Sequence, residues 1–326
     1  MSYVKNVAIV GANGTVGTFI TDALLKTGKH TITALTRSTS GNFPFGVKLA
    51  TIDYDKPETI VSALKDQQVL IITMGVGAPP EQQLKLIDAA ADAGVPYVMP
   101  NDWGYDVSRD DMYKESFFHL QSKTARAHIE ERGVSSWISL VCGFWYEFSL
   151  GQGTETFGID SSKKEAILFD GGNTQMDTST LSYVGKTVAA LLSLPEKKAD
   201  AAATTSGGKG GSLEQFKNNY VRVAEFSVTQ REMLDSVQRV SGTTDKDWKI
   251  SHETTRERYA HASGEVMKGN YALFVTAMYS RVWFPDGSPV YHDKGLHDEL
   301  LGLQKEELDV ASKRAVDRGR VGYNSH

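Results

Sequence analysis

The sequence predicts an α/β fold, a doubly wound parallel sheet of the Rossmann type with a smaller mixed α/β region after it. Three observations predict this fold. Short apolar runs rich in β-branched residues alternate with helix-like stretches, a glycine-rich turn "GANGTVG" separates the first run from the first helix, and the alternation stops near residue 150. We therefore expect one domain over residues 1–150 and a smaller region over residues 151–326.

Strands and helices alternate through the first half. The strands are expected at 4–10, 31–36, 47–53, 69–73, 97–100 and 137–141, and the helices at 15–27, 57–66, 80–93 and 111–132. Gly28, Gly94 and Gly133 follow three of these helices directly, which is typical of a helix C-terminus. Elements of this length in this order form right-handed βαβ units and a parallel sheet.

The second half has a less regular pattern. A strand and turn are expected at 166–177, and helices at 178–194, 229–241, 253–282 and 296–318. A glycine- and alanine-rich stretch near 196–214 predicts a flexible surface loop. We expect this half to close over the carboxyl ends of the strands and to bind the substrate.

Composition and charge exclude several classes of protein. The formal net charge is −5 and no basic cluster is present, so we expect no nucleic-acid partner. The single cysteine, Cys142, excludes an intramolecular disulfide and indicates a reducing compartment. We find neither a leader-like N-terminus nor a long apolar run, so we expect a cytoplasmic protein without a membrane partner. The histidines form no metal-binding motif, so we expect no metal site. A homodimer is a possible assembly of the chain.

The glycine turn at 11–17 predicts a phosphate site. Free N–H groups at a helix start point outward, the helix dipole favours an anion, and missing Cβ atoms let a pyrophosphate approach the backbone. The predicted cofactor-binding residues of this turn are Gly11, Asn13, Gly14, Thr15, Val16 and Gly17. The alternative interpretation is a plain strand-to-helix turn, but the position after the first strand favours dinucleotide binding.

The end of the second strand indicates which dinucleotide is bound. No acidic residue occurs between the start of this strand and Asp53, whereas an NAD site usually has a carboxylate there. Arg37 and Ser38 stand just past the strand end instead, and a guanidinium suits a 2′-phosphate. We therefore predict NADP(H) as the cofactor; the alternative for Arg37 is a solvated surface arginine.

Three longer stretches resemble one family. They are "QLKLIDAAADAGVPYVMPNDWGYDV", "KTARAHIEERGVSSWISLVCGFW" and "LFDGGNTQMDTSTLSYVGKTVAALL". They resemble the NmrA-like and isoflavone-reductase-like proteins, an atypical branch of the short-chain dehydrogenase fold, and the likeness covers roughly residues 5–195. Asn101, Asp102 and Trp103 replace the Ser-Glu-Phe of these proteins. No Tyr-x-x-x-Lys pair occurs, and we interpret Tyr183 and Lys186 as structural.

The resemblance implies roles for further residues. Lys123 matches a lysine that acts beside the nicotinamide as general acid or base, although by itself it is also typical of a solvated helix face. His119 is either a proton relay or a structural histidine. Gly75, Gly143 and Phe144 are assigned to the cofactor site together with Lys123. The residues assigned to the substrate site are Trp103, His119, Trp145 and Tyr146, with Tyr105 and Phe148 as further aromatic candidates; ordinary core packing is the alternative for these rings.

The function that this resemblance implies is an NADPH-dependent reductase of a small aromatic or conjugated secondary metabolite, such as an enone or a quinone-methide-like compound. Two alternatives remain open. One is a regulator of the NmrA kind that senses the dinucleotide without turning it over. The other is an isomerase or cyclase that uses the same pocket.

Overall fold

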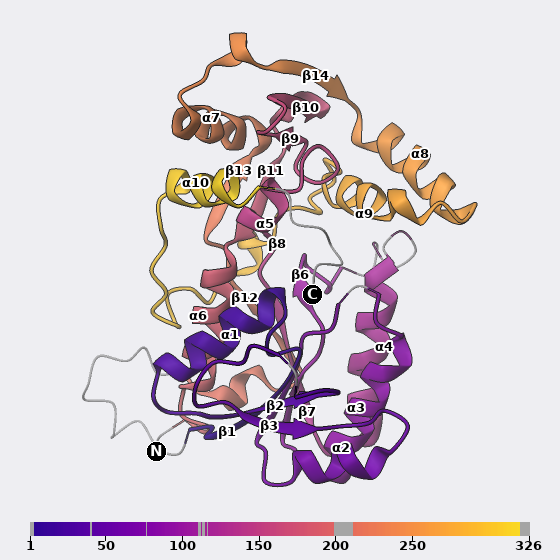
Figure 1. Cartoon of the computed structure of the whole chain (residues 1–326), viewed down its shortest axis with the longest axis vertical. Coiled ribbons are helices and arrows are strands. Elements are labelled where there is room, and N and C mark those ends of the chain that lie inside the picture. The colour runs from indigo at the N-terminus through magenta and orange to yellow at the C-terminus, as the bar shows by residue number, and fades with distance from the viewer. Residues whose placement is uncertain are drawn as a thin grey trace.

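The computed structural model describes residues 3–39, 41–75, 77–109, 112, 115, 117–198 and 211–319, without the side chains of residues 117–120. Figure 1 shows the sheet and its helices in the lower part of the molecule and the smaller sheets in the upper part. Most of the loop expected at 196–214 lies outside the described residues.

A parallel sheet forms the centre of the first half. Its strands are β1 (Asn6–Val10), β2 (Thr31–Thr36), β3 (Lys48–Thr51), β4 (Val69–Ile72), β5 (Tyr97–Met99), β6 (Trp103–Gly104), β7 (Ser136–Val141) and β12 (Asn219–Arg222). The strand order is β12-β7-β5-β4-β1-β2-β3, with β6 paired to β7. From β1 the chain runs to β2 and β3 on one side of β1, and it then crosses to β4 on the other side. The strand order therefore reverses between β1 and β4. Open α/β sheets bind their ligands at such a reversal.

Helices cover both faces of this sheet (Figure 1). They are α1 (Thr15–Lys26) and α6 (Leu181–Leu192) on one face, and α2 (Pro57–Leu64), α3 (Pro80–Asp92) and α4 (Phe117–Arg132) on the other. Residues of β1 alternate between the two cores: Val7 and Ile9 pack toward α1, and Ala8 and Val10 pack toward α2 and α3. Both faces are therefore buried, as the unbroken apolar strands predict.

The second half builds a further core and also completes the first sheet. Its elements are α5 (Tyr146–Leu150), α7 (Gln230–Ser241), α8 (Thr255–Met267), α9 (Phe274–Val282) and α10 (Leu308–Arg318), with strands β8 (Phe144–Trp145), β9 (Ile159–Asp160), β10 (Glu165–Phe169), β11 (Gln175–Ser179), β13 (Phe226–Thr229) and β14 (Lys249–Glu253). Because α6 packs on α1 and β12 pairs with β7, the division expected at residue 150 does not follow the packing.

Two expected helices are corrected by the structure. The stretch 253–282 forms α8 and α9, separated at Gly269, whose φ of 94° ends the first helix. The stretch 296–318 is helical only in α10, from Leu308. Hydropathy alone did not separate the helical part of this stretch from the loop that packs beside it.

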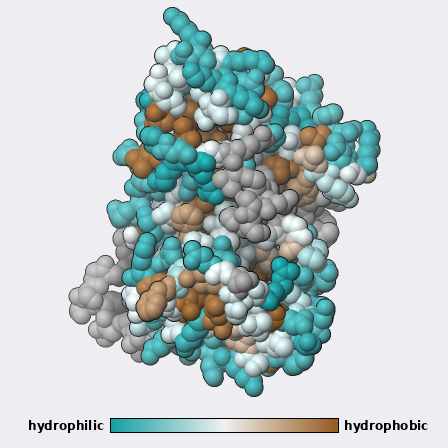
Figure 2. Space-filling model, in the orientation of Figure 1, coloured by the Kyte–Doolittle hydropathy of each residue, from teal (hydrophilic) through white to brown (hydrophobic). Residues whose placement is uncertain are grey.

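The surface in Figure 2 is largely hydrophilic, with hydrophobic residues in separate patches. Phe45, Met267 and Tyr271 are large apolar side chains that are exposed, and they lie on different segments. Within the described part of the chain, no helix combines the length and the apolar character that crossing a membrane requires.

Glu147 gives the fold a pH dependence. It is only 4% exposed, and burial raises the pKa of its carboxyl to about 7, although its oxygens accept the Leu181 N–H at the start of α6. Between pH 4.5 and pH 7 the Glu147 carboxyl therefore keeps its proton in the folded chain and loses it in the unfolded chain. Because the folded chain binds more protons in this window, the free energy of unfolding falls as the pH rises through it. A shift of this size corresponds to about 3 kcal/mol.

We expect Glu147→Gln to raise the melting temperature at pH 8 and to flatten its pH dependence, because a neutral amide still accepts the Leu181 N–H. Thermal unfolding between pH 5 and pH 8 measures this effect. Glu165→Gln on β10, whose carboxylate pairs with Lys249 at the surface, is the control. An equal response of both variants would contradict the prediction.

Candidate dinucleotide and substrate site

Two glycines of the turn after β1 are required by the packing of the chain. Gly11 has a φ of 79°, and a Cβ atom there would overlap the carbonyl oxygen of Thr73. A Cβ atom on Gly17 would overlap the carbonyl oxygen of Gly11. These glycines therefore let the turn, α1 and the end of β4 approach one another closely.

Gly14 is different, because its backbone is extended with a φ of −78° and any residue could adopt this conformation. A Cβ atom on Gly14 would meet only the carbonyl oxygen of Gly11, at 3.1 Å. Gly14 also caps α1, no side chain caps this helix start, and its first turn contains no acidic residue. The space at Gly14 and the open helix start fit a pyrophosphate.

The other residues of the turn differ in exposure. Val16 is buried, so only its backbone can reach a ligand, whereas Asn13 is exposed and Thr15 is half-buried. Across the crevice, Thr73 donates from its hydroxyl to the carbonyl of Val10 at 2.7 Å. Gly75 is exposed and has open space where a Cβ atom would lie. The loop after β4 thus faces the glycine turn at the point where the strand order reverses.

Arg37 and Ser38 are exposed at the end of β2. Burial raises the pKa of Tyr54, just beyond β3, and the positive charge of Arg37 opposes this shift. The guanidinium therefore lies near Tyr54, at the carboxyl edge of neighbouring strands. It is a cation placed where the adenosine end of a dinucleotide bound at the glycine turn would lie.

Lys123 is exposed on the second turn of α4. A buried ion pair anchors this helix: Nη1 of Arg126 donates to Oδ2 of Asp102 at 2.7 Å, and the side chains are 9% and 2% exposed. Arg126 also donates to the Ser122 hydroxyl, and Ser139 on β7 donates to Asp102 at 2.8 Å. Because Asp102 lies between the end of β5 and the start of β6, these contacts hold α4, and with it Lys123, at the carboxyl edge of the sheet.

The sequence reasoning missed this pair, although one signal was present. Arg126 falls on the same helical stripe as Ala125 and Ile129, which are both fully buried. A charge on the buried stripe of a helix requires a partner, so an acidic residue near the strand ends could have been expected. The side chain of His119 lies outside the described part of the structure.

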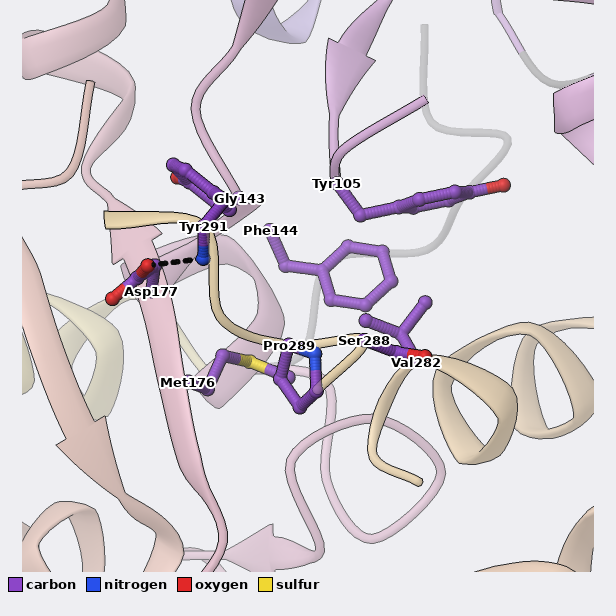
Figure 3. A pocket seen from close by; sticks show the side chains of 9 residues that line it. All are labelled: Tyr105, Gly143, Phe144, Met176, Asp177, Val282, Ser288, Pro289 and Tyr291. Atoms are coloured by element: carbon purple, nitrogen blue, oxygen red, sulfur yellow. Dashed lines mark hydrogen bonds between the residues drawn. The ribbon is translucent and has the colours of Figure 1, made fainter. Parts of the chain in front are cut away.

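An aromatic pocket lies beyond the end of β7 (Figure 3). The residues that line it are Tyr105, Gly143, Phe144, Met176, Asp177, Val282, Ser288, Pro289 and Tyr291, and they leave no room for a water molecule. The Phe144 ring stacks on Tyr279 of α9, with 3.9 Å between ring centroids, and Tyr105 meets its edge. Gly143 has a φ of 68°, and a Cβ atom there would overlap the Asp177 carbonyl oxygen. Gly143 is therefore required between β7 and β8, where the chain passes close to β11.

Two residues expected in the substrate site are placed in cores instead. Trp103 is 8% exposed, packs in the core against α1 and α6, and donates from its indole N–H to the Ile72 carbonyl at 2.7 Å. Tyr146 is fully buried, and its hydroxyl lies 2.7 Å from that of Ser312 on α10. Both expectations are corrected, because their polar atoms are satisfied inside the protein.

Phe148, one of the remaining aromatic candidates, is 7% exposed and packs in the core. Trp145 is half-buried and meets the edge of the Phe148 ring. The interpretation of Tyr183 as structural agrees with its burial and with the hydrogen bond that its hydroxyl donates to Asp298. Burial raises the pKa of Cys142 to about 12, so this thiol supplies no nucleophile.

Fold and site together define a doubly wound protein with a dinucleotide crevice at the reversal of its strand order. Among the described residues, no group of His, Cys, Asp or Glu side chains could hold a metal ion. The NmrA-like family matches residues 4–205, which is more than half of the chain. The protein belongs to the NmrA-like family.

Relatives by sequence include fungal and plant proteins. Oxidoreductase aprR of Aspergillus flavus is 26% identical over 269 residues, which are 81% of this chain and 82% of the relative. Oxidoreductase poxI of Penicillium oxalicum is 24% identical over 91% of this chain and 90% of the relative. An isoflavone reductase-like protein of Olea europaea is 32% identical over 39% of this chain and 45% of the relative.

Solved structures share the fold. AtPrR2 with NADP⁺ and (+)pinoresinol has a TM-score of 0.73 at 18% identity, covering 96% of this chain and 99% of the other. An isoflavone reductase has a TM-score of 0.72 at 20% identity, covering 94% and 97%. The predicted Rossmann fold and family are confirmed.

Proposed function

We propose that the protein is an NADPH-dependent reductase of a small aromatic or conjugated secondary metabolite, with Lys123 as its proton-transfer group. The observation that carries this proposal is that the predicted phosphate site and the predicted proton donor lie at the same edge of the sheet. The open helix start at Gly14 and the helix that presents Lys123 both lie at the carboxyl ends of the strands.

The protein is an oxidoreductase and its cofactor is NADP(H). Relatives that cover most of the chain carry the name oxidoreductase, and similar folds bind NADP⁺ or NADPH. The space at Gly14 fits the pyrophosphate, with the N–H groups of Thr15 and Val16 as donors, and Arg37 would hold the 2′-phosphate. When bound, NADPH supplies a hydride for an electron-poor carbon of the substrate.

Lys123 would give a proton to the oxygen that gains charge in the reaction. An exposed ammonium at the crevice can reach such an oxygen, and a closely bound substrate would exclude water from it. The ion pair of Arg126 with Asp102 would keep the helix in place while the proton moves. Gly75, Gly143 and Phe144 would contact the nicotinamide half of the cofactor.

An aromatic substrate is supported by the rings near the end of β7. Tyr105 and Phe144 line the pocket in Figure 3, and Tyr279 stacks behind Phe144. Tyr105 and Phe144 are only 6% and 8% exposed, so a flat, conjugated molecule would stack on them only after the side chains around them move. Similar folds are named for pinoresinol, isoflavone, leucoanthocyanidin, quinone and triphenylmethane compounds.

A substrate panel tests the proposed function. Purified protein is incubated with NADPH and a set of phenolic enones, quinones and quinone methides, and absorbance at the band of the reduced cofactor is followed. We expect oxidation of NADPH with at least one compound and a reduced product by mass spectrometry. NADPH binding without any turnover would contradict the reductase and favour a dinucleotide sensor; product formation without net NADPH oxidation would favour an isomerase or cyclase.

We expect Arg37→Ala to weaken NADPH binding by about 1.5–3 kcal/mol, the range of a hydrogen bond to a charged group. NADH binding should change little, because NADH has no 2′-phosphate. Titration calorimetry with both dinucleotides measures the difference. Lys65→Ala, which removes an exposed cation after α2, is the control. Equal losses for NADPH and NADH would show that Arg37 only supports the fold.

A further inference from the structure

The side-chain amide of Asn101 connects the ends of two neighbouring strands. Its Oδ1 accepts the Met74 N–H at 3.0 Å, and its Nδ2 donates to the Met74 carbonyl at 3.1 Å. Its own N–H donates to Oε1 of Gln83 on α3 at 2.8 Å, and Gln83 is only 8% exposed. Asn101 follows β5 and Met74 follows β4, so the amide pairs the two loops as an additional strand residue would.

The segment held in this way forms one wall of the dinucleotide crevice. Met74 comes directly after Thr73, whose carbonyl oxygen packs against Gly11 of the glycine turn. Gly75 comes directly after Met74 and has open space beside it. The amide of Asn101 therefore fixes the backbone that stands opposite the start of α1.

The strand order indicates which half of the cofactor this wall contacts. Arg37 lies at the end of β2, on one side of β1, whereas Asn101 and Met74 lie at β5 and β4, on the other side. A dinucleotide with its pyrophosphate at β1 and its 2′-phosphate at Arg37 therefore extends its nicotinamide half over β4 and β5.

Only a side-chain amide of this length satisfies both backbone groups of Met74. Aspartate could accept the N–H, but its second oxygen would face the Met74 carbonyl and add a negative charge beside the crevice. Serine is too short to reach both groups. An unpaired backbone group in a part-buried place costs free energy, so the loop would move toward water.

We propose that Asn101 is a positioning residue that presets the wall after β4 for the nicotinamide half of NADP(H). This inference rests on NADP(H) as the cofactor and not on the role of Lys123. Asn101 acts through the backbone of Met74 and Gly75, and its contribution is preorganisation of the binding site.

Binding of a whole and a half cofactor tests the proposal. We expect Asn101→Ser and the nearly isosteric Asn101→Asp to weaken NADPH binding by about 10- to 100-fold, because serine loses both backbone hydrogen bonds and aspartate turns a negative oxygen toward the Met74 carbonyl. The affinity for 2′,5′-ADP, which lacks the nicotinamide half, should stay within about twofold, because its site at Arg37 and the glycine turn is untouched. Calorimetry measures both affinities.

Asn6→Ser is the matched control, because its amide donates to the Asp66 carbonyl at 2.9 Å at the opposite edge of the same sheet. It should leave both affinities unchanged. Hydrogen exchange of the Met74 amide, measured without any ligand, should speed up in Asn101→Ser, which loses the acceptor of this N–H, and not in the Asn6→Ser control. Slow exchange at the amides of β1 and β4 in the same experiment shows that each variant is folded.

Four results separate the possible failures. Equal weakening of NADPH and 2′,5′-ADP, or unchanged NADPH binding with fast exchange at Met74, would overturn the role of Asn101. Slow exchange at Met74 in Asn101→Ser would overturn the contact itself. A wild-type protein that binds neither ligand would overturn NADP(H) as the cofactor, and this inference with it.

Discussion

Lys123→Ala should lower turnover by about 10²–10⁴-fold, the usual contribution of a positioned general acid or base. The affinity for NADPH should change little, because the pyrophosphate and the 2′-phosphate would be held by the glycine turn and Arg37. The side chain is exposed, so its removal leaves no cavity and the stability of the fold should be preserved. Steady-state rates with a substrate found in the panel, together with calorimetric titration of NADPH, measure both effects.

Two further variants define what Lys123 contributes. Lys123→Arg should not restore the rate, because a guanidinium keeps its proton near neutral pH. Lys186→Ala on α6, an exposed helical lysine close to Tyr183 in the sequence, should keep the wild-type rate. Full activity of Lys123→Ala would show that this lysine is a solvated residue of the helix surface without a catalytic role. Full rescue by arginine would mean that charge alone stabilises the substrate oxygen.

Gly14→Val should weaken NADPH binding by at least about 10-fold, because one or two hydrogen bonds to the pyrophosphate, of about 1.5–3 kcal/mol each, would be lost. The backbone at Gly14 is compatible with valine, so the protein should still fold. The branched side chain would instead occupy the space in which the pyrophosphate lies. Calorimetric titration and circular dichroism of the same preparation measure binding and folding.

Two other glycines provide the controls for Gly14. Gly17→Ala should fail to fold or lose most of its stability, because its Cβ atom would overlap the Gly11 carbonyl oxygen. Gly264→Val on α8, where the surrounding space is open, should bind NADPH as the wild type does. Wild-type NADPH affinity in a folded Gly14→Val variant would remove the pyrophosphate site from this turn.

Elements that depend on nearby residues could be predicted from the sequence. The expected strand at 31–36 coincides with β2, and α1, α3 and α4 end before Gly28, Gly94 and Gly133, which all have positive φ. The glycine turn was placed correctly between β1 and α1, because a tight turn before a helix needs small residues at fixed spacing. Hydrophobic periodicity and turn chemistry act over a few residues, and one chain contains all of that information.

Other features required contacts between distant segments. The sequence by itself determined the alternating first half, the turn that can accept a pyrophosphate, and Arg37 at the end of its strand. Tertiary structure decided that β12 returns to pair with β7, that Trp103 turns into the core, and that Asp102 meets Arg126 on α4. The physical reason is that burial and pairing of a polar or aromatic side chain depend on which surfaces meet, and residues far apart in the chain supply those surfaces.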